Sequence, residues 1–155
     1  MYTVTIEHIA PCRIVALQHR GPYMEIDSKF EKLNAWAANH GLLGPHSRSF
    51  GIYYDDPSAV PAEALRSEAC LSIPENFKSD GEYRAMETPS GRCARLLFIG
   101  PYSELEKPYD WLYGTWLPKS GEELADQPCF EEYLNDPRDV PASELRTAIC
   151  VPLKG

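Results

Sequence analysis

The chain has 155 residues, of which 43% are hydrophobic and 25% are charged. A chain of this length buries enough surface to form a core unaided, which excludes the small scaffolds that depend on disulfides or a structural metal. Its formal net charge of -8 would repel a phosphate backbone, so we expect no direct binding to nucleic acid.

The N-terminal segment MYTVTIEHIA lacks the basic and apolar regions of a secretory signal. No apolar run approaches the roughly 18 residues that span a bilayer, so we expect a cytoplasmic protein without a membrane partner. The five cysteines show no C-x-x-C spacing and the four histidines are scattered. We therefore predict reduced, buried cysteines, no metal and no cofactor.

The first half of the chain predicts a strand, a helix and two further strands. β-Branched and apolar residues run as far as Gly21, where Pro22 ends the strand because proline has no amide hydrogen. Apolar residues at helical spacing follow, and Gly41 lies just beyond them. The expected bounds are 13–20 for the first strand, 26–38 for the helix, and 49–54 and 65–73 for the later strands.

The second half predicts the same order of elements after a polar segment at 75–91, in which residues 83–88 are a candidate strand. Pro108 suits the first turn of a helix. An apolar stripe at helical spacing follows it and consists of Tyr109, Leu112, Tyr113, Trp116 and Leu117. Strands are expected at 129–134 and 145–153.

The two halves are copies of one unit. RIVALQHRGPY at 13–23 resembles RCARLLFIGPY at 92–102, and the segment 50–71 matches 130–151 at ten of 22 positions without a gap. Equivalent residues of the two copies are 79 positions apart in the first of these segments and 80 positions apart in the second. The change in this offset falls within the intervening helical region. We predict an α+β fold with a mostly antiparallel sheet and approximate internal two-fold symmetry. Each half is too small to stand alone, so we expect a single domain over 1–155 with repeats of about 1–79 and 80–155.

Acidic residues are concentrated in the second half, where 80–155 carry 14 acidic and 8 basic side chains. Such a surface either serves solubility or attracts a basic protein or cationic small molecules.

One carboxylate distinguishes the copies. Strand alternation places Glu68 away from the apolar face, and its counterpart in the second half is Ala148. Glu68 either points into a cleft or pairs with Arg66 or another surface cation. The neighbouring Glu131 and Glu132 point to opposite faces, so at most one enters a cleft, and we expect a solvated role.

Aromatic side chains are the second feature, and most belong to the core. Trp111 lies off the apolar stripe and would be exposed unless it rims a groove or meets a partner, and Tyr53 and Tyr133 lie on the less apolar face of their strands. An aromatic groove with one carboxylate suits planar, cationic or weakly basic molecules. The candidate ligand-binding residues are Tyr53, Glu68, Phe98, Trp111, Tyr113, Trp116 and Tyr133.

The GPY turns, YYDDPSAVPAEALRSE at 53–68, EKPYDWL at 106–112 and PCFEEYLND at 128–136 together resemble the DNA gyrase inhibitor, or GyrI-like, family. The resemblance covers essentially the whole chain. It implies a duplicated β-α-β-β unit with a curved sheet, helices packed on it and a central groove, as in the effector-binding domains of AraC-type and MerR-type multidrug regulators. In those regulators a groove glutamate on the last strand meets cationic drugs, and Ala148 stands at that position here.

The resemblance also implies a function. We expect a stand-alone protein that binds small molecules, inhibits or modulates DNA gyrase and protects against gyrase toxins or DNA-damaging agents. The alternatives are a protein that sequesters drugs or toxins, or a hydrolase of cyclopropane-bearing DNA alkylators that uses Glu68, Tyr53 and Tyr133. No nucleophile motif is present, so the catalytic residues, if any, stay unknown.

Overall fold

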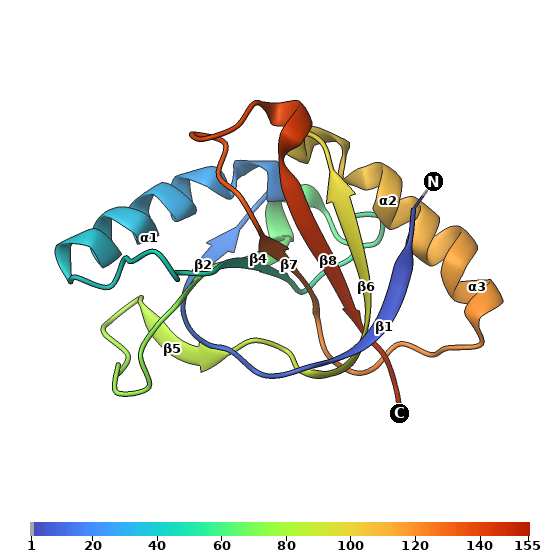
Figure 1. Ribbon diagram of the computed structural model, residues 1–155, viewed down its shortest axis with the longest axis horizontal. Coiled ribbons are helices and arrows are strands. Elements are labelled where there is room, and N and C mark those ends of the chain that lie inside the picture. Colours follow the sequence, from blue (N-terminus) through green and yellow to red (C-terminus); the bar gives the residue numbers. More distant parts are fainter. Residues whose placement is uncertain (1) are drawn as a thin grey trace. The chain divides into compact units, whose positions relative to one another are not determined.

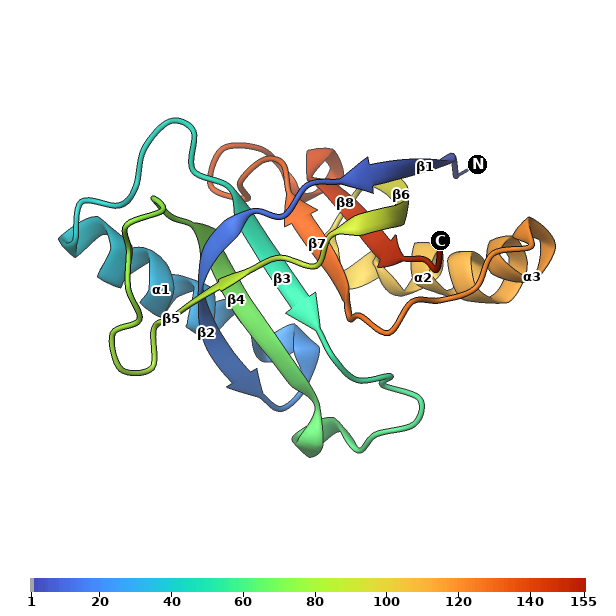
Figure 2. The ribbon, with the colours of Figure 1, turned by 90° about the horizontal axis from the view of Figure 1, so that it is seen from below.

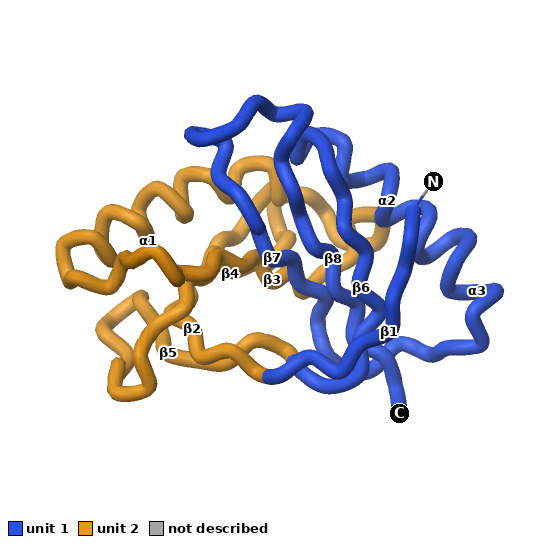
Figure 3. The backbone as a smooth tube through the Cα atoms, in the orientation of Figure 1, with its two compact units in different colours: residues 1–10, 90–155 blue, residues 11–89 orange. Residues whose placement is uncertain are grey.

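The structure, a computed structural model, describes residues 2–155 as strands and helices in two compact units. One unit comprises residues 11–89, and the other combines residues 1–10 with 90–155 (Figure 3). Among residues 2–155, no helix has both the length and the apolar composition needed to cross a membrane.

The unit of residues 11–89 is a four-stranded antiparallel sheet with one helix against it (Figure 1). The strand order is β3-β4-β2-β5. Helix α1 buries Leu33 and Ala37 against the sheet and is followed by Gly41, whose φ of +66° favours glycine. The elements are β2 (Arg13–Arg20), α1 (Asp27–Asn39), β3 (Ser49–Tyr53), β4 (Arg66–Ser72) and β5 (Arg84–Glu87).

The unit of residues 1–10 and 90–155 has the same plan with strand order β1-β6-β8-β7 (Figure 2). Its helical segment packs Leu112 and Trp116 on a core that includes Leu96 and Ile149. The elements are β1 (Val4–Ile9), β6 (Gly91–Ile99), α2 (Glu106–Trp111), a π-helical turn (Leu112–Trp116), α3 (Leu117–Ser120), β7 (Cys129–Tyr133) and β8 (Arg146–Pro152).

The π-helical turn joins α2 to α3 in one continuous helix. The amide of Leu117 donates to the carbonyl of Leu112, five residues earlier instead of four. Pro118 follows directly and has no amide hydrogen to donate to the carbonyl of Gly114, which an α-helix would require. The wider turn therefore lies where the sequence cannot complete regular α-helical bonding.

Both copies of the repeat close the strand-to-helix turn in the same way. The amide of Gly21 donates to the carbonyl of Leu65 at 2.9 Å, and Gly100 donates to Leu145 at 2.8 Å. The tyrosine that follows in each turn packs against the tyrosine at the end of the next strand, Tyr23 on Tyr53 and Tyr102 on Tyr133. These matched contacts, with the matched strands, confirm the predicted α+β fold of duplicated β-α-β-β units.

The predicted strand at 83–88 is present as β5, but β1 was not predicted. The compact units also differ from the sequence repeat at both ends, because β1 pairs with β6 and β5 pairs with β2. The single domain over 1–155 stays a prediction.

Candidate functional site

Two glutamates are buried among the residues that the structure describes. Glu68 is 3% exposed and Glu131 is 4% exposed. A carboxylate taken out of water is costly unless charges or hydrogen-bond donors compensate it. The surroundings of these two side chains therefore show where the chain has built a polar site.

Glu131 is held by tyrosine hydroxyls. Tyr109 of α2 donates to its Oε2 at 2.6 Å, and Tyr133 of β7 donates to its Oε1 at 2.8 Å. Glu131 lies opposite Ile149 of β8, on the face that the helical segment covers. Each carboxylate oxygen thus accepts a hydrogen bond beneath α2. The expectation of a solvated Glu131 is wrong, because Tyr109, which covers it, comes from 22 residues earlier in the chain.

Two further side chains complete this group, which we call the Glu131 cluster. The rings of Tyr109 and Tyr113 are parallel within 8° with centroids 6.4 Å apart. Burial and the nearby charge of Glu131 raise the pKa of the Cys129 thiol to about 11, against the opposing effect of hydrogen bonds with Tyr113 and Tyr109. The cluster consists of Tyr109, Tyr113, Cys129, Glu131 and Tyr133.

The predicted aromatic residues of the same unit lie around the core beneath the helix. Phe98, Trp111 and Trp116 are half-buried against it. Trp111 also packs on Tyr2, with ring centroids 5.3 Å apart. The N-terminal segment thus covers the ring of Trp111, which the sequence predicted to be exposed unless it rims a groove or meets a partner.

Glu68 is a different kind of buried carboxylate. Arg84 of β5 lies 2.5 Å from both of its oxygens, and the Tyr54 hydroxyl donates to Oε2 at 3.1 Å. Burial and the nearby Glu68 charge raise the pKa of Tyr54 well above its ordinary value. Of the predicted partners, Arg66 binds Asp55 instead at 2.9 Å, and Arg84, whose side chain is 45% exposed, is the other surface cation that pairs with Glu68. The charge of Glu68 is therefore already neutralised within its own unit.

Tyr53 does not join Glu68. It lies opposite Ser67 on the face covered by α1, whereas Glu68 lies opposite Ile52 on the other face. The less apolar face assigned to Tyr53 and Tyr133 is wrong, because β3 and β7 each bury consecutive residues, which face opposite sides of the sheet, so composition does not separate the two faces.

The copies differ at the Glu131 cluster. At the repeat offsets, Gly51 is the counterpart of Glu131 and Phe30 is the counterpart of Tyr109. The cluster is therefore a property of one copy only. The sequence does contain a signal for this cluster, because Gly51 of the first copy aligns with Glu131 of the second. Comparison of the two repeats would have identified it.

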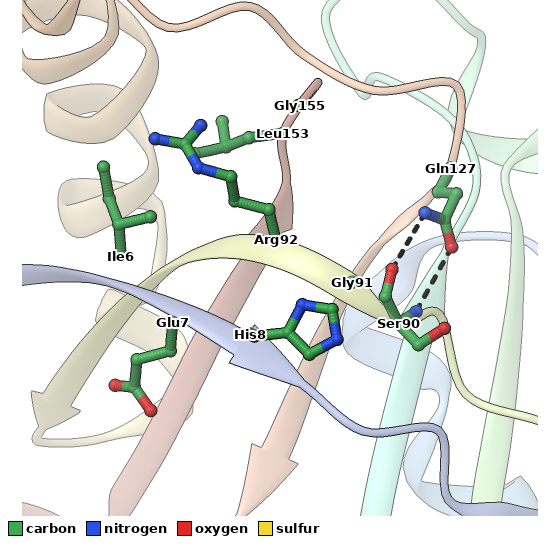
Figure 4. A pocket seen from close by; sticks show the side chains of 9 residues that line it. All are labelled: Ile6, Glu7, His8, Ser90, Gly91, Arg92, Gln127, Leu153 and Gly155. Carbon is green, nitrogen blue, oxygen red and sulfur yellow. Dashed lines mark hydrogen bonds between the residues drawn. The ribbon is translucent and has the colours of Figure 1, made fainter.

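A surface hollow of about 460 Å³ lies elsewhere in the same unit, beside β1 and β6 (Figure 4). Ser90 and Gln127 hydrogen-bond to each other on its rim, and Arg92 is paired with Glu122. These three polar residues are thus already paired, and none of the residues that line the hollow is a buried carboxylate.

Small-molecule sites are lined mainly by apolar and aromatic side chains with a few polar groups. A buried carboxylate among aromatic rings, within duplicated β-α-β-β units, fits a small-molecule-binding domain. The chain belongs to the GyrI-like family, because the family model described as "GyrI-like small molecule binding domain" matches residues 2–154.

Individual proteins agree with this family. A "DNA gyrase inhibitor" of Erwinia billingiae is 38% identical over 111 residues, which cover 69% of each chain. The C-terminal domain of EcmrR superposes with a TM-score of 0.81 at 21% identity, covering 99% of this chain and 98% of that one. SAV2435, solved bound to tetraphenylphosphonium, has a TM-score of 0.67 at 13% identity and covers 99% and 94% of the two chains.

Proposed function

We propose that this protein binds an aromatic organic cation at the Glu131 cluster. The observation that carries the proposal is the buried carboxylate of Glu131, held by the hydroxyls of Tyr109 and Tyr133. A fixed negative charge beneath stacked tyrosine rings attracts a cation through charge and through the ring faces. A neutral analogue of the same shape gains only the apolar contacts.

The predicted ligand-binding residues divide under this proposal. Tyr113 and Tyr133 belong to the cluster, and Phe98, Trp111 and Trp116 would support it from the adjoining core. Glu68 is assigned a structural part, because Arg84 already occupies both of its oxygens. The same ion pair disfavours a hydrolase in which Glu68 acts as the base, since a general base needs an accessible lone pair.

Tetraphenylphosphonium is a suitable probe because a domain of the same fold has been solved with it. We expect titration of the protein with this cation to quench tryptophan fluorescence, and triphenylphosphine oxide, which is neutral, to bind more weakly. The variant Glu131→Gln keeps the size of the side chain and removes its charge. It should bind tetraphenylphosphonium at least about tenfold more weakly.

The matched control is Glu132→Gln. Glu132 is the next residue of β7 and lies opposite Ala148, on the other face. The control should bind as the wild type does. Absence of wild-type binding at millimolar cation, or equal affinity of Glu131→Gln and wild type, would refute the proposal.

A second candidate function is the modulation of DNA gyrase. Relatives at 38% and 34% identity carry the name "DNA gyrase inhibitor", and the excess of acidic residues in 80–155 suits a basic partner surface. Under this proposal the protein binds gyrase directly and protects cells from gyrase-directed toxins. The test is calorimetry with purified gyrase at low ionic strength, together with a supercoiling assay; absence of both binding and inhibition would reject this function.

A further inference from the structure

Strand β1 is the outer edge strand of its unit (Figure 2). It pairs with β6, and β6 pairs with β8 on its other side. The carbonyl of Arg92 accepts a hydrogen bond from the amide of Leu153, so the main-chain groups of Arg92 point toward β8. Main-chain groups alternate in direction along a strand. Those of Cys93 therefore point toward β1, where Glu7 lies opposite.

Three residues of β1 direct their amides and carbonyls away from β6. The three are Val4, Ile6 and His8, which alternate with residues directed at β6. The side chains from Thr5 to His8 are also exposed. The segment VTIEHI contains neither proline nor lysine, the residues with which edge strands commonly prevent further pairing. This edge is therefore open to another strand.

The edge strand of the other unit is better protected. Strand β5 has only four residues, and short edge strands offer little to pair with. The amide of Thr88, just beyond it, donates to the carbonyl of Cys12 on the β2 side, so alternation directs the main chain of Ala85 away from β2. There the amide of Ala85 donates to the hydroxyl of Ser79 at 2.9 Å. Strand β1, by contrast, has six residues and no described strand beyond it.

We infer that β1 binds the β1 of a second copy of this chain, in a two-fold dimer whose antiparallel pairing is centred on Ile6. Paired strands join residues whose main-chain groups point at each other, so this register sets Ile6 opposite the partner's Ile6 and His8 opposite the partner's Val4. All three outward-directed residues of each copy then pair. Glu7 lies opposite the partner's Thr5, whereas a register centred on Glu7 would set two like charges opposite each other.

The hollow beside β1 fits a second copy as well (Figure 4). Ile6 and His8 line it from β1, together with Leu153 of the apolar core. Residues directly opposite on paired strands carry their side chains on the same face. The partner's Val4, opposite His8, therefore lies on the face that holds the hollow. Ile6, which is 44% exposed, packs against the partner's Ile6 at the two-fold axis, so the dimer covers it as well as the strand edge.

Cysteine cross-linking tests the register. The Cα atoms of a hydrogen-bonded antiparallel pair are about 5.5 Å apart, which a disulfide can bridge. Ile6→Cys, oxidised with diamide, should therefore run as a covalent dimer on non-reducing electrophoresis. The matched control is His8→Cys on the same edge, because the two copies of residue 8 are roughly 14 Å apart in this register. It should remain monomeric, as should the oxidised wild type with its native cysteines. Failure of Ile6→Cys to cross-link, or equal cross-linking of His8→Cys, would overturn the inference.

Sedimentation equilibrium measures the dimer without a cross-link. We expect the wild type to self-associate between about 10 and about 500 μM, because a contact between two edge strands is small. Ile6→Lys should weaken the dimer at least about tenfold, because it sets two ammonium groups opposite each other. The control Met24→Lys makes the same change of charge at a side chain that is 65% exposed in the other unit, and it should associate as the wild type does. A wild type that is monomeric at about 500 μM, or equal association of the two lysine variants, would overturn the inference and leave the proposed function standing.

Discussion

The two buried glutamates are compensated by different chemistry. Glu68 is paired with a guanidinium, and Glu131 accepts hydrogen bonds from two phenol hydroxyls. An ion pair cancels charge within the protein, whereas neutral donors stabilise a carboxylate and leave its negative charge in place. At the scale of single residues, this difference supports the proposed structural part for Glu68 and the proposed ligand-binding part for Glu131.

The structural part of Glu68 predicts a loss of stability when its partner is removed. Arg84→Met should lower the free energy of unfolding by about 2 kcal/mol, because a buried carboxylate then lacks its counter-charge. The double variant Arg84→Met/Glu68→Leu should recover most of this loss, since it removes the carboxylate as well. Urea denaturation of the three proteins measures both effects. If Arg84→Met is as stable as the wild type, the ion pair between Arg84 and Glu68 contributes nothing to the free energy of unfolding.

Sequence reasoning located some of these residues and misplaced others for physical reasons. Alternation along β7 correctly separated Glu131 from Glu132, because side chains on a strand alternate between its faces. It did not show which face was covered by a helix, and that depends on Tyr109 of α2. Burial of Glu68 was foreseen as one of two alternatives, but its partner Arg84 comes from β5, whose pairing no local pattern specifies.

At the scale of elements, the strands that the repeat contains and the first helix were predicted to within a residue or two, because both copies supplied the same pattern, whereas the second helical segment was predicted from its apolar stripe without bounds. The residues of β1, VTIEHI, are rich in β-branched side chains and carried a strand signal that went unused. The π-helical turn was indicated only as a one-residue change of offset. Sequence spacing shows that a residue is added, but the hydrogen bonds that absorb it are seen only in the structure.

Alanine substitution at two glycines of the second helical segment should change the free energy of unfolding in opposite directions. Gly121→Ala should lower the free energy of unfolding by about 1 kcal/mol, because its φ of +75° is strained for a residue with a Cβ. Gly114→Ala should raise it by up to about 1 kcal/mol, because alanine loses less backbone entropy in a helix. Thermal and urea denaturation of both variants give the signs. Equal signs would contradict these assignments of the two backbone conformations.

At the scale of the whole molecule, the net charge of -8 predicts how gyrase association depends on salt. Raising KCl from about 50 to about 500 mM should weaken binding by tenfold or more, because screening removes long-range attraction. The helices offer a matched pair of charge variants. Glu106→Lys/Asp110→Lys on α2 should weaken association, and Asp27→Lys/Glu31→Lys at the equivalent positions of α1 should not. Equal effects of the two pairs would remove the acidic second half from the interaction.

The order of the strands along the chain has a consequence for synthesis on the ribosome. Residues 11–89 form one continuous unit, so all of its strands are available once residue 89 has emerged. Strand β1 is made before this unit, but its pairing partner β6 begins at Gly91. Strand β1 must therefore wait, without β6 to pair with, while an entire compact unit is translated behind it. This interval is when the nascent chain is most open to binding by a chaperone or by another copy of itself.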